Sequence, residues 1–590
     1  MKDKKILIGT ALVLLLLLTT GLSYAYFSTA VKGNDNAKDV VVEAGTLKLT
    51  YTDGPTINVQ NVKPGWTTTK TVSVKNNGTL DTAYNIVWQE LTNTILKNEL
   101  VISATCKKLN ASGTVEGTCE PITELPVRAK RIAKNISIES GFTHEYTFTF
   151  LFKETNTSQN YNQGKEFSGV LGIEEYKDNS SKPIYCTFDG ELTQGVEYTN
   201  GQYTYKYMQK KVGFYDTEFE KWNSVWQNSN IDGWGVELTN TTSSTDAVTT
   251  TLCTYINNKP IVSTNYMFFK SRAKVIDLSG FDTSNVTSMS GMFYGSSAIT
   301  INGLENFDTS KVTDMSYMFY GSSAITINGL ENFDTGKVTD MSYMFSNSAA
   351  TTLDVSAFDT SNVINMSSMF GYSKATILDV SNFDTSNVTN MSQMFYFSNA
   401  TTLDVSTFDT SNVTDMSSMF SNSKATTLDV SAFDTSNVTN MSSIFYYSAV
   451  TTLDVSTFNT SNVTNMSYMF GYSKATTLDV SNFDTSNVTD MSGMFYFSKA
   501  TTLDVSSFDT SNVTNMWRMF ENSINLKTIY ASNKFNTDKV TTDVEMFSGC
   551  TNLVGGAETK YNSSYTDKTY AHIDGGTSNP GYFTDIADKK

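Results

Sequence analysis

Apolar residues return at fixed positions of one phrase that is repeated between residues 274 and 547. The phrase contains FDTSNVT or a close variant, and its phenylalanine recurs at intervals of 26, 26 and then 25 residues. A single copy holds too few apolar residues to offset the conformational entropy lost on folding. Successive copies must therefore stack on one another, so the repeat predicts a solenoid.

Within one copy, the spacing of the apolar residues changes from two to three and four. Leu353 and Val355 are two residues apart, as on one face of a strand. Over residues 363–370 the apolar positions recur at steps of three and four, as on one face of a short helix. Thr360 or Ser361 stands where a helix N-cap is expected. Each coil is therefore predicted to be strand, turn and short helix, which makes the array an α/β solenoid of the leucine-rich-repeat kind.

The repeated phrase FDTSNVTxMSxMF and its flanks resemble the BspA-like leucine-rich-repeat surface proteins of bacteria. The leading flank runs from Cys186 to Cys253, and the closing flank runs from Tyr570 to Phe583. The resemblance covers residues 184–584 and implies an extracellular protein of adhesion or interaction. It carries over no residue-level site.

The first 25 residues have the pattern of an export signal. A basic start is followed by an apolar run over residues 6–18 and by the small-x-small sequence Ser23-Tyr24-Ala25. Cleavage after Ala25 is expected, which would leave no membrane span in the mature chain. An uncleaved anchor over residues 6–22 is the alternative.

Residues 26–178 alternate β-branched and polar residues between turn signals such as Asn77-Gly78, which predicts an all-β sandwich. The run from Pro64-Gly65 to Tyr84-Asn85-Ile86, together with the signal ending in Ala-Tyr-Phe-Ser, resembles the TasA/camelysin family of exported matrix proteins. Some relatives form fibres, which implies that assembly is an option here. Others have been described as proteases, although the sequence offers no residues to ligate zinc.

These patterns divide the chain into six segments. They are a signal peptide over 1–25, a β-sandwich over 26–178, a linker over 179–183, an aromatic-rich cap over 184–271, repeats over 272–548 and a C-terminal cap over 549–590.

Composition argues against several classes of function. The net charge of -17 is unsuited to nucleic acid, whose phosphates demand clustered lysine and arginine. The chain has only two histidines, His144 and His572, and no phosphate-binding or HExxH phrase. We therefore expect no enzyme activity, no cofactor and no metal site.

The five cysteines predict two disulfides in an exported chain. Cys106 and Cys119 flank a short polar segment, and two free buried thiols are the alternative there. Cys186 and Cys253 are expected to staple the leading cap. Cys550 is expected to be a buried apolar residue, with an intermolecular disulfide as the alternative.

The predicted strands place one aspartate per coil on the outside of the solenoid, between the inward Leu and Val. We call this column the acidic face, and we take its members as candidate ligand-binding residues. Neighbouring carboxylates should repel one another, which would raise their pKa values or attract cations. A solvated face that prevents aggregation, a docking face for a basic protein and a site for divalent cations are the three interpretations. The members are Asp354, Asp379, Asp404, Asp429, Asp454, Asp479 and Asp504.

Three further sets of residues have an expected function, and two of these sets have an alternative one. A second aspartate column, which includes Asp359 and Asp384, is expected to support the turn and the start of each helix. An aromatic series that follows each Met-Phe pair is expected to be either an adhesive edge or core packing. The cap tryptophans Trp222, Trp226 and Trp234 are expected either to pack in the core or to form a carbohydrate platform. The aromatic series is Tyr372, Phe397, Tyr447, Tyr472 and Phe497.

Together these patterns predict an exported bacterial surface or matrix protein found in the extracellular space. Its function would be adhesion to proteins of a host or a neighbouring cell, including the extracellular matrix, through the acidic solenoid face. The alternative is a structural component that forms fibres through its N-terminal domain, with the solenoid as a passive stalk.

Overall fold

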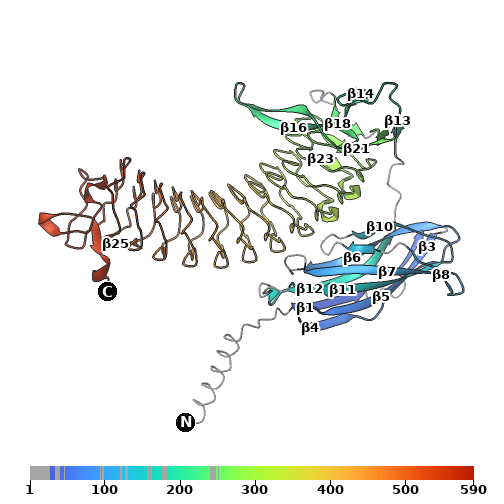
Figure 1. Ribbon diagram of the computed structural model, residues 1–590, viewed down its shortest axis with the longest axis horizontal. Coiled ribbons are helices and arrows are strands. Elements are labelled where there is room, and N and C mark those ends of the chain that lie inside the picture. The colour runs from blue at the N-terminus through green and yellow to red at the C-terminus, as the bar shows by residue number, and fades with distance from the viewer. Residues whose placement is uncertain are drawn as a thin grey trace, which may run out of the picture. The chain divides into compact units, whose positions relative to one another are not determined.

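The computed structural model describes residues 27–33, 40–44, 47–93, 95, 99–119, 122–125, 131–155, 159, 162–175, 183–239, 247–249 and 252–589. The chain forms two compact units, Met1–Lys177 and Asp178–Lys590 (Figure 1). The expected signal peptide and residues 179–182 of the expected linker lie outside the described ranges. Within those ranges the regular structure is β-strand with a few short 3-10 turns, and no α-helix occurs.

Two β-sheets build the N-terminal unit. One has five strands in the order β10-β6-β12-β1-β4, with β1 parallel to β12. The other has seven strands, in the order β2-β3-β5-β11-β7-β8 with β9 also paired to β7. The bounds are β1 Phe27–Gly33, β2 Val40–Ala44, β3 Leu47–Thr52, β4 Ile57–Val62, β5 Thr67–Asn76, β6 Thr82–Asn93, β7 Leu100–Leu109, β8 Val115–Gly117, β9 Ile122–Leu125, β10 Arg131–Ile138, β11 Thr143–Phe152 and β12 Glu166–Glu175.

The two sheets of this unit share one apolar core. Burial alternates along β11 because successive side chains of a strand point to opposite faces. Phe148 and Phe150 of β11 and Phe167 of β12 are completely buried. Trp88 of β6 meets Phe167 edge to face, with ring centroids 5.6 Å apart. The β-structure expected over residues 26–178 is therefore observed in the part that is described.

A six-stranded sheet and a hairpin form the leading cap of the second unit. The sheet order is β13-β20-β21-β18-β15-β14, and β16 pairs with β17. Trp234 is completely buried in the same apolar core as the first coils, so its expected role in core packing is confirmed. The bounds are β13 Tyr185–Cys186, β14 Glu197–Asn200, β15 Tyr203–Tyr207, β16 Gln209–Asp216, β17 Lys221–Asn228, β18 Trp234–Leu238, β20 Tyr255–Ile256 and β21 Lys259–Ser263.

The coils follow the cap as a row of similar loops (Figure 1). Short parallel sheets lie at the two ends of the row. The first joins β19 Ala247–Thr249, β22 Val275–Asp277 and β23 Thr300–Asn302, and the last joins β24 Thr502–Asp504, β25 Thr528–Ala531 and β26 Phe583–Asp585. The short 3-10 turns are η2 Leu304–Asn306, η3 Leu330–Asn332, η4 Lys568–Tyr570, η5 Gly576–Ser578 and η6 Ile586–Asp588.

The apolar positions of every coil point inward, as the repeat predicts. Leu403 is 5% exposed, and Val405, Val413, Met416 and Phe420 are completely buried. The phenylalanine at the end of each MSxMF phrase stacks on its equivalents in both neighbouring coils. Centroid distances along this column are between 5.2 and 6.0 Å. The column therefore provides a continuous aromatic core from the cap to the closing segment.

The polar side chains of the FDTSNVT phrase join one coil to the next. Thr410 Oγ1 donates to a carbonyl of the following coil at 2.8 Å. Asn412 Nδ2 and Thr414 Oγ1 donate to carbonyls of the preceding coil at 2.7 and 3.2 Å. Asp409 Oδ1 accepts from the amide and hydroxyl of Ser411, which closes the turn between them. The motif thus satisfies buried backbone carbonyls, which are costly to leave unpaired.

The predicted helix of each coil is wrong, and so is the α/β class of the solenoid. From Met391 to Ser398, alternate amides donate to carbonyls of the next coil or to the residue three positions back. In an α-helix each amide after the first turn donates to the carbonyl four residues back, and no amide of this segment does so. Gln393 and Phe397 have φ of 58° and 52°, which is the left-handed region that successive tight turns require. The second unit is therefore an all-β solenoid of turns and bridges.

The expected N-cap function is wrong for the same reason. Thr360 is completely buried, and its Oγ1 donates to the carbonyl of Asp384 in the next coil at 2.9 Å. Ser361 donates to Asp359, so it belongs to the turn. A threonine hydroxyl makes the bond to the following coil at Thr283, Thr309, Thr335, Thr360, Thr385, Thr410, Thr435, Thr460, Thr485 and Thr510.

The closing cap is organised around one buried carboxylate. Asp574 accepts from the amides of Ala557, Thr559, Gly576 and Gly581 and from the Thr559 hydroxyl. Burial alone would raise its pKa, but these donors outweigh burial and lower it to about 2. Asp574 thus ties the closing segment together as an ionised group. No helix in the described part of the chain has the length and apolar character needed to cross a bilayer.

Candidate functional site: the exposed columns of the solenoid

The acidic face lies on the outside of the solenoid, as the sequence predicts. Asp504 is half-buried, and the other six aspartates are exposed. Each carboxylate, however, is engaged within its own coil. Asp404 Oδ1, for example, accepts from the amide of Ser406 at 3.1 Å and from its hydroxyl at 2.6 Å. The face is therefore a series of closed turns, each of which also presents a negative charge.

The expected rise in the pKa values of this face is wrong for three members. Hydrogen bonds from Ser431 and Ser456 lower the pKa values of Asp429 and Asp454, and the repulsion of Asp429 by Asp454 is a smaller effect. Burial raises the pKa of Asp504, but bonds from Lys589 and Ser506 outweigh it, so the net change is downward. These carboxylates are therefore ionised at neutral pH.

The second aspartate column supports turns, as expected, but no helix. Asp359 and Asp434 accept from the amide two residues ahead at 3.1 and 2.9 Å. Since no helix follows, the predicted interaction with a helix dipole does not occur. Asp384 is 1% exposed, Asp359 is half-buried and Asp434 is exposed, so this column contributes less to the surface than the acidic face does.

A column of aromatic rings forms the second exposed feature of the solenoid. Tyr372, Phe397 and Tyr447 are 45%, 40% and 45% exposed. Tyr372 stacks on Phe397 at 5.0 Å, and Tyr472 stacks on Tyr447 at 4.0 Å and on Phe497 at 4.4 Å. We define the aromatic edge as this column with the rings packed against it. Its members are Tyr372, Tyr396, Phe397, Tyr446, Tyr447, Tyr468, Tyr472, Tyr496, Phe497 and Trp517.

The stacked rings occupy positions that disfavour bulky side chains. Tyr372, Phe397 and Tyr447 have φ of 56°, 52° and 52°. Such a conformation costs roughly 1–2 kcal/mol for a residue other than glycine. Other coils place Gly321 or Asn422 at the equivalent position, which avoids or reduces that strain. Ring stacking contributes about 0.5–1.5 kcal/mol per pair in addition to the burial of ring area, which offsets this strain, and the exposed part of each ring stays free for contact.

Sequence reasoning found the stacked rings but missed Tyr396, Tyr446 and Tyr496. Each follows directly after the last phenylalanine of MSxMF, where neighbouring coils have Gly371, Ser421 or Gly471. Because the missing residues are spaced 50 apart, a search at the 25-residue period does not isolate them. The sequence pattern that identifies them is the alternation of tyrosine with a small residue from coil to coil.

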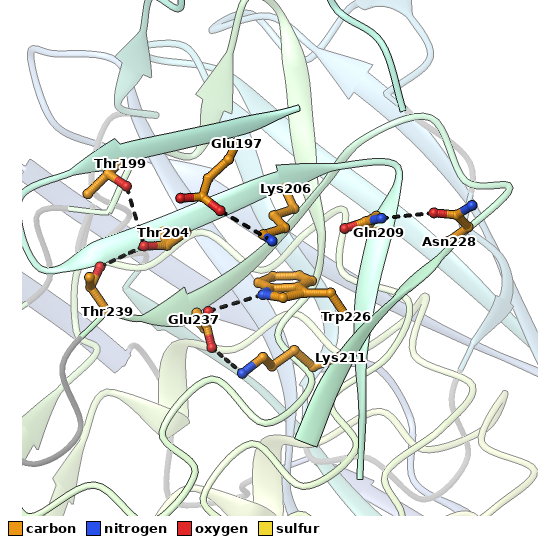
Figure 2. Close-up of polar contacts among 10 residues, drawn as sticks. All are labelled: Glu197, Thr199, Thr204, Lys206, Gln209, Lys211, Trp226, Asn228, Glu237 and Thr239. Atoms are coloured by element: carbon orange, nitrogen blue, oxygen red, sulfur yellow. Dashed lines mark hydrogen bonds and ion pairs between the residues drawn. The ribbon is translucent and has the colours of Figure 1, made fainter. Parts of the chain in front are cut away.

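Polar contacts hold the cap hairpin β16–β17 against β18 (Figure 2). Trp226 Nε1 donates to Glu237 Oε1 at 3.1 Å, and Lys211 forms an ion pair with the same carboxylate. Lys206 pairs with Glu197 at 3.2 Å on the neighbouring hairpin. Trp226 is thus engaged in a structural network. Trp222 meets Tyr294 and Tyr317 at 5.7 and 5.6 Å, so the hairpin lies over aromatic residues of the leading coils.

Both predicted disulfides are confirmed, and the remaining cysteine is buried. Cys106–Cys119 links residues on β7 and after β8, and Cys186–Cys253 lies in the cap. The Cys550 thiol donates to the Phe520 carbonyl at 2.9 Å, and burial raises its pKa to about 12. The two disulfides fit an extracellular protein.

His144 is buried next to the first disulfide. Its Nδ1 lies 2.9 Å from the hydroxyl of Tyr84, which also meets the hydroxyl of Tyr146 at 2.8 Å. Burial lowers the pKa of His144 to about 4, with a smaller opposing effect of Glu139 and a reinforcing effect of Lys108. The imidazole is therefore neutral in the folded protein at neutral pH.

We expect the N-terminal unit to lose stability in acid because of His144. The unfolded imidazole binds a proton below about pH 6.5, whereas the folded one does so only near pH 4. Stability is therefore complete above pH 6.5 and falls by up to about 3 kcal/mol as the pH drops to 4. Unfolding of the N-terminal unit from pH 8 to 4 should be flatter in H144Q than in H572Q. Parallel pH profiles would contradict this expectation.

Two family models match the chain. The model described as Camelysin metallo-endopeptidase matches residues 2–171. The model described as Mycoplasma protein of unknown function, DUF285, matches residues 215–325, 262–378, 296–402, 372–479 and 471–578. Searches of the curated proteins and of the solved structures returned no match.

The first match questions the prediction that the protein is not an enzyme, and it implies a metal ion in the N-terminal region. Among the described residues, one group of three potential ligands is compact: Cys106, Cys119 and His144, whose ligand atoms lie within 4.8 Å of one another. The two sulfurs are bonded to each other, and His144 Nδ1 faces Tyr84. Thiolates, which bind metals, are absent from a disulfide, so these residues do not fit a metal ion.

The second match extends over the hairpin of the leading cap, all the coils and most of the closing cap. Its five overlapping segments together span residues 215–578, more than half of the chain. The 25-residue coil with its FDTSNVT phrase is the unit that recurs through them. The chain therefore belongs to the family described as Mycoplasma protein of unknown function, DUF285.

Proposed function

We propose that this protein is an extracellular surface protein that binds macromolecules non-covalently through the aromatic edge of its solenoid. The resemblance of its coils to BspA-like surface proteins and its two disulfides support an extracellular binding function. The proposed partners are proteins of a host or a neighbouring cell and components of their extracellular matrix.

One observation carries the proposal, namely that stacked aromatic rings occupy exposed positions with left-handed backbone. Tyr372, Phe397 and Tyr447 are each at least 40% exposed there. Aromatic residues are enriched at the centres of binding interfaces, because they offer a large contact area with little loss of side-chain entropy. A column of such residues gives a partner several equivalent contacts, and linked contacts increase avidity.

The acidic face is a weaker candidate than the aromatic edge. Its carboxylates accept hydrogen bonds within their own turns, and charged groups exposed to water contribute mainly to association rate and solubility. We therefore assign the acidic face a supporting function, in which it prevents aggregation.

Binding by residues 26–590 to immobilised fibronectin, laminin, collagen and fixed bacterial cells tests this function. Substituting all five stacked rings by asparagine, Y372N/F397N/Y447N/Y472N/F497N, should reduce binding at least about tenfold. Asparagine tolerates the left-handed region and stands at Asn422 naturally, so the coil should keep its shape.

The matched control neutralises three members of the acidic face, D404N/D429N/D454N, and should retain binding. Binding that survives in the ring variant but fails in the acidic variant would transfer the function to the acidic face. Absence of binding to every surface, with fibres visible by electron microscopy, would favour a structural protein.

A further inference from the structure

The aromatic edge has a second period of two coils. Tyr396, Tyr446 and Tyr496 are 50 residues apart. Exposed lysines recur at the same 50-residue spacing, and they stand in the coils between these tyrosines. The lysines are Lys374, Lys424 and Lys474, and Lys499 departs from the alternation.

The three tyrosines are turned relative to the stacked rings. Tyr396 is 89° from Tyr372 and 81° from Phe397, and Tyr496 is 89° from both Tyr472 and Phe497. The stacked rings cover one another's faces along the solenoid. The turned rings therefore direct their faces across the solenoid axis, and all three remain partly exposed. Tyr446 adopts the same orientation, at 88° from Tyr472.

The lysines give this edge a positive charge. Lys374, Lys424 and Lys474 are exposed and form no ion pair with any described residue. The next aspartate of the acidic face follows each lysine by five residues in the sequence. The exposed ammonium groups are therefore available to an anionic ligand.

Parallel coils lie about 4.8 Å apart, so like groups two coils apart are separated by about 10 Å. This is close to the length of two sugar rings in an extended β-linked polysaccharide. The apolar face of a sugar ring packs well on an aromatic face, and a carboxylate pairs with a lysine. The edge therefore repeats one stacking group and one cation for every two sugars.

We propose that the aromatic edge binds an extended acidic polysaccharide in which an anionic sugar alternates with a neutral sugar. The neutral sugars stack on Tyr396, Tyr446 and Tyr496, and the carboxylates meet the lysines of the coils between. This assignment rests on the proposed function, because it names the ligand class of the same edge.

In the leading coils, the protein itself covers the aromatic residues that precede the aromatic edge. There the hairpin of β16 and β17 lies over Tyr294 and Tyr317, which Trp222 contacts. Lys270 Nζ donates to the Trp222 carbonyl at 2.8 Å, which fixes the hairpin in place. From Tyr372 onwards, no described segment covers the rings in this way. The polysaccharide would continue along the edge from the point where the hairpin ends.

Calorimetric titration of residues 26–590 with three oligosaccharides tests the proposal. The probes are hyaluronan, in which uronate alternates with a neutral sugar, chitin oligosaccharides, which are neutral, and polygalacturonate, which is charged at every sugar. We expect hyaluronan to bind tightest, with an affinity that falls as salt increases.

Two variants separate the contributions of the rings and the lysines. Y396S/Y446S/Y496S and K374N/K424N/K474N should each weaken hyaluronan binding at least about tenfold. Serine and asparagine stand at the equivalent positions Ser421 and Asn399, so both variants use residues that the fold already accepts. D404N/D429N/D454N is the control, and it should bind at least as tightly as the unmodified protein.

Equal affinity for all three probes, or unchanged hyaluronan binding by either variant, would overturn the proposal. Dimerisation of the unmodified protein that is lost in the tyrosine variant, without hyaluronan binding, would identify a second copy as the occupant. If hyaluronan fails to bind but matrix proteins bind through the stacked rings, the polysaccharide is wrong and the proposed function stands. If neither binds, both fail.

Discussion

Replacing Phe420 with alanine should destabilise the solenoid by about 3–5 kcal/mol. Phe420 is completely buried, and its ring stacks between Phe395 and Phe445 at 5.7 and 5.9 Å. Removing the ring leaves a cavity in the middle of the column, and rigid coils on either side limit the collapse that would fill it. Because each coil contacts only its neighbours, the loss should open the array at this point.

Urea denaturation followed by pulse proteolysis measures the free energy of unfolding of the solenoid, from the amount of solenoid that survives cleavage. Thr402 is exposed in the same coil, so T402A is the control and should change stability by less than about 0.5 kcal/mol. A loss below about 1 kcal/mol in F420A would show that the phenylalanine column is not the core of the solenoid.

Removing the cap disulfide by C186S/C253S should cost the second unit about 4 kcal/mol, because the bond closes a loop with a sequence separation of 67 residues. The closed loop includes strands β14, β15 and β18 of the sheet that covers the apolar end of the solenoid. Opening it should expose that end, so protease cleavage should begin in the cap and proceed into the first coils.

C106S/C119S is the matched control for the cap variant. Its disulfide has a sequence separation of 13 residues and lies in the other unit, so it should weaken the N-terminal unit by about 3 kcal/mol and leave the solenoid transition unchanged. If both variants lowered the same transition, the two units would not unfold independently.

The period and the inward positions of the repeat were predictable because they depend on burial alone. Val413, Met416 and Phe420 had to be buried whatever the backbone does between them, since a single coil cannot form a core. The two disulfides were predictable from cysteine count and an exported chain. The placement of the acidic face outside followed from the alternation of Leu403, Asp404 and Val405.

The spacing of the apolar residues alone could not show that the helix is absent. Residues three and four apart also fall on one side of successive tight turns, so the positions from Val413 to Phe420 suit both structures. Two features favour the turns. Alternate amides donate to the neighbouring coil, and the segment is so short that helix nucleation is unfavourable. Serine and asparagine in MSxMF and its flanks favour turns over helix.

The hydrogen bonds of the acidic face within its own turns could also not be predicted from the spacing of its aspartates. Charge spacing predicts repulsion between Asp429 and Asp454, but the serine two residues after each aspartate supplies two donors and reverses the direction of the pKa change. The same phrase, Asp-Val-Ser, was available in the sequence as a turn signal. The turned tyrosines at 396, 446 and 496 required the two-coil period to be recognised.

The coils are joined through the FDTSNVT and MSxMF turns and not through a sheet of the Leu-Asp-Val strands. Hydrogen–deuterium exchange resolved to single coils tests this most directly. Amides from Met391 to Ser398 donate alternately to the next coil and within the segment, whereas those of Leu403, Asp404 and Val405 have no acceptor among the described residues. We predict strong protection in the first segment and fast exchange in the second, in every central coil. Slow exchange over Leu403–Val405 with fast exchange over Met391–Ser398 would contradict the account.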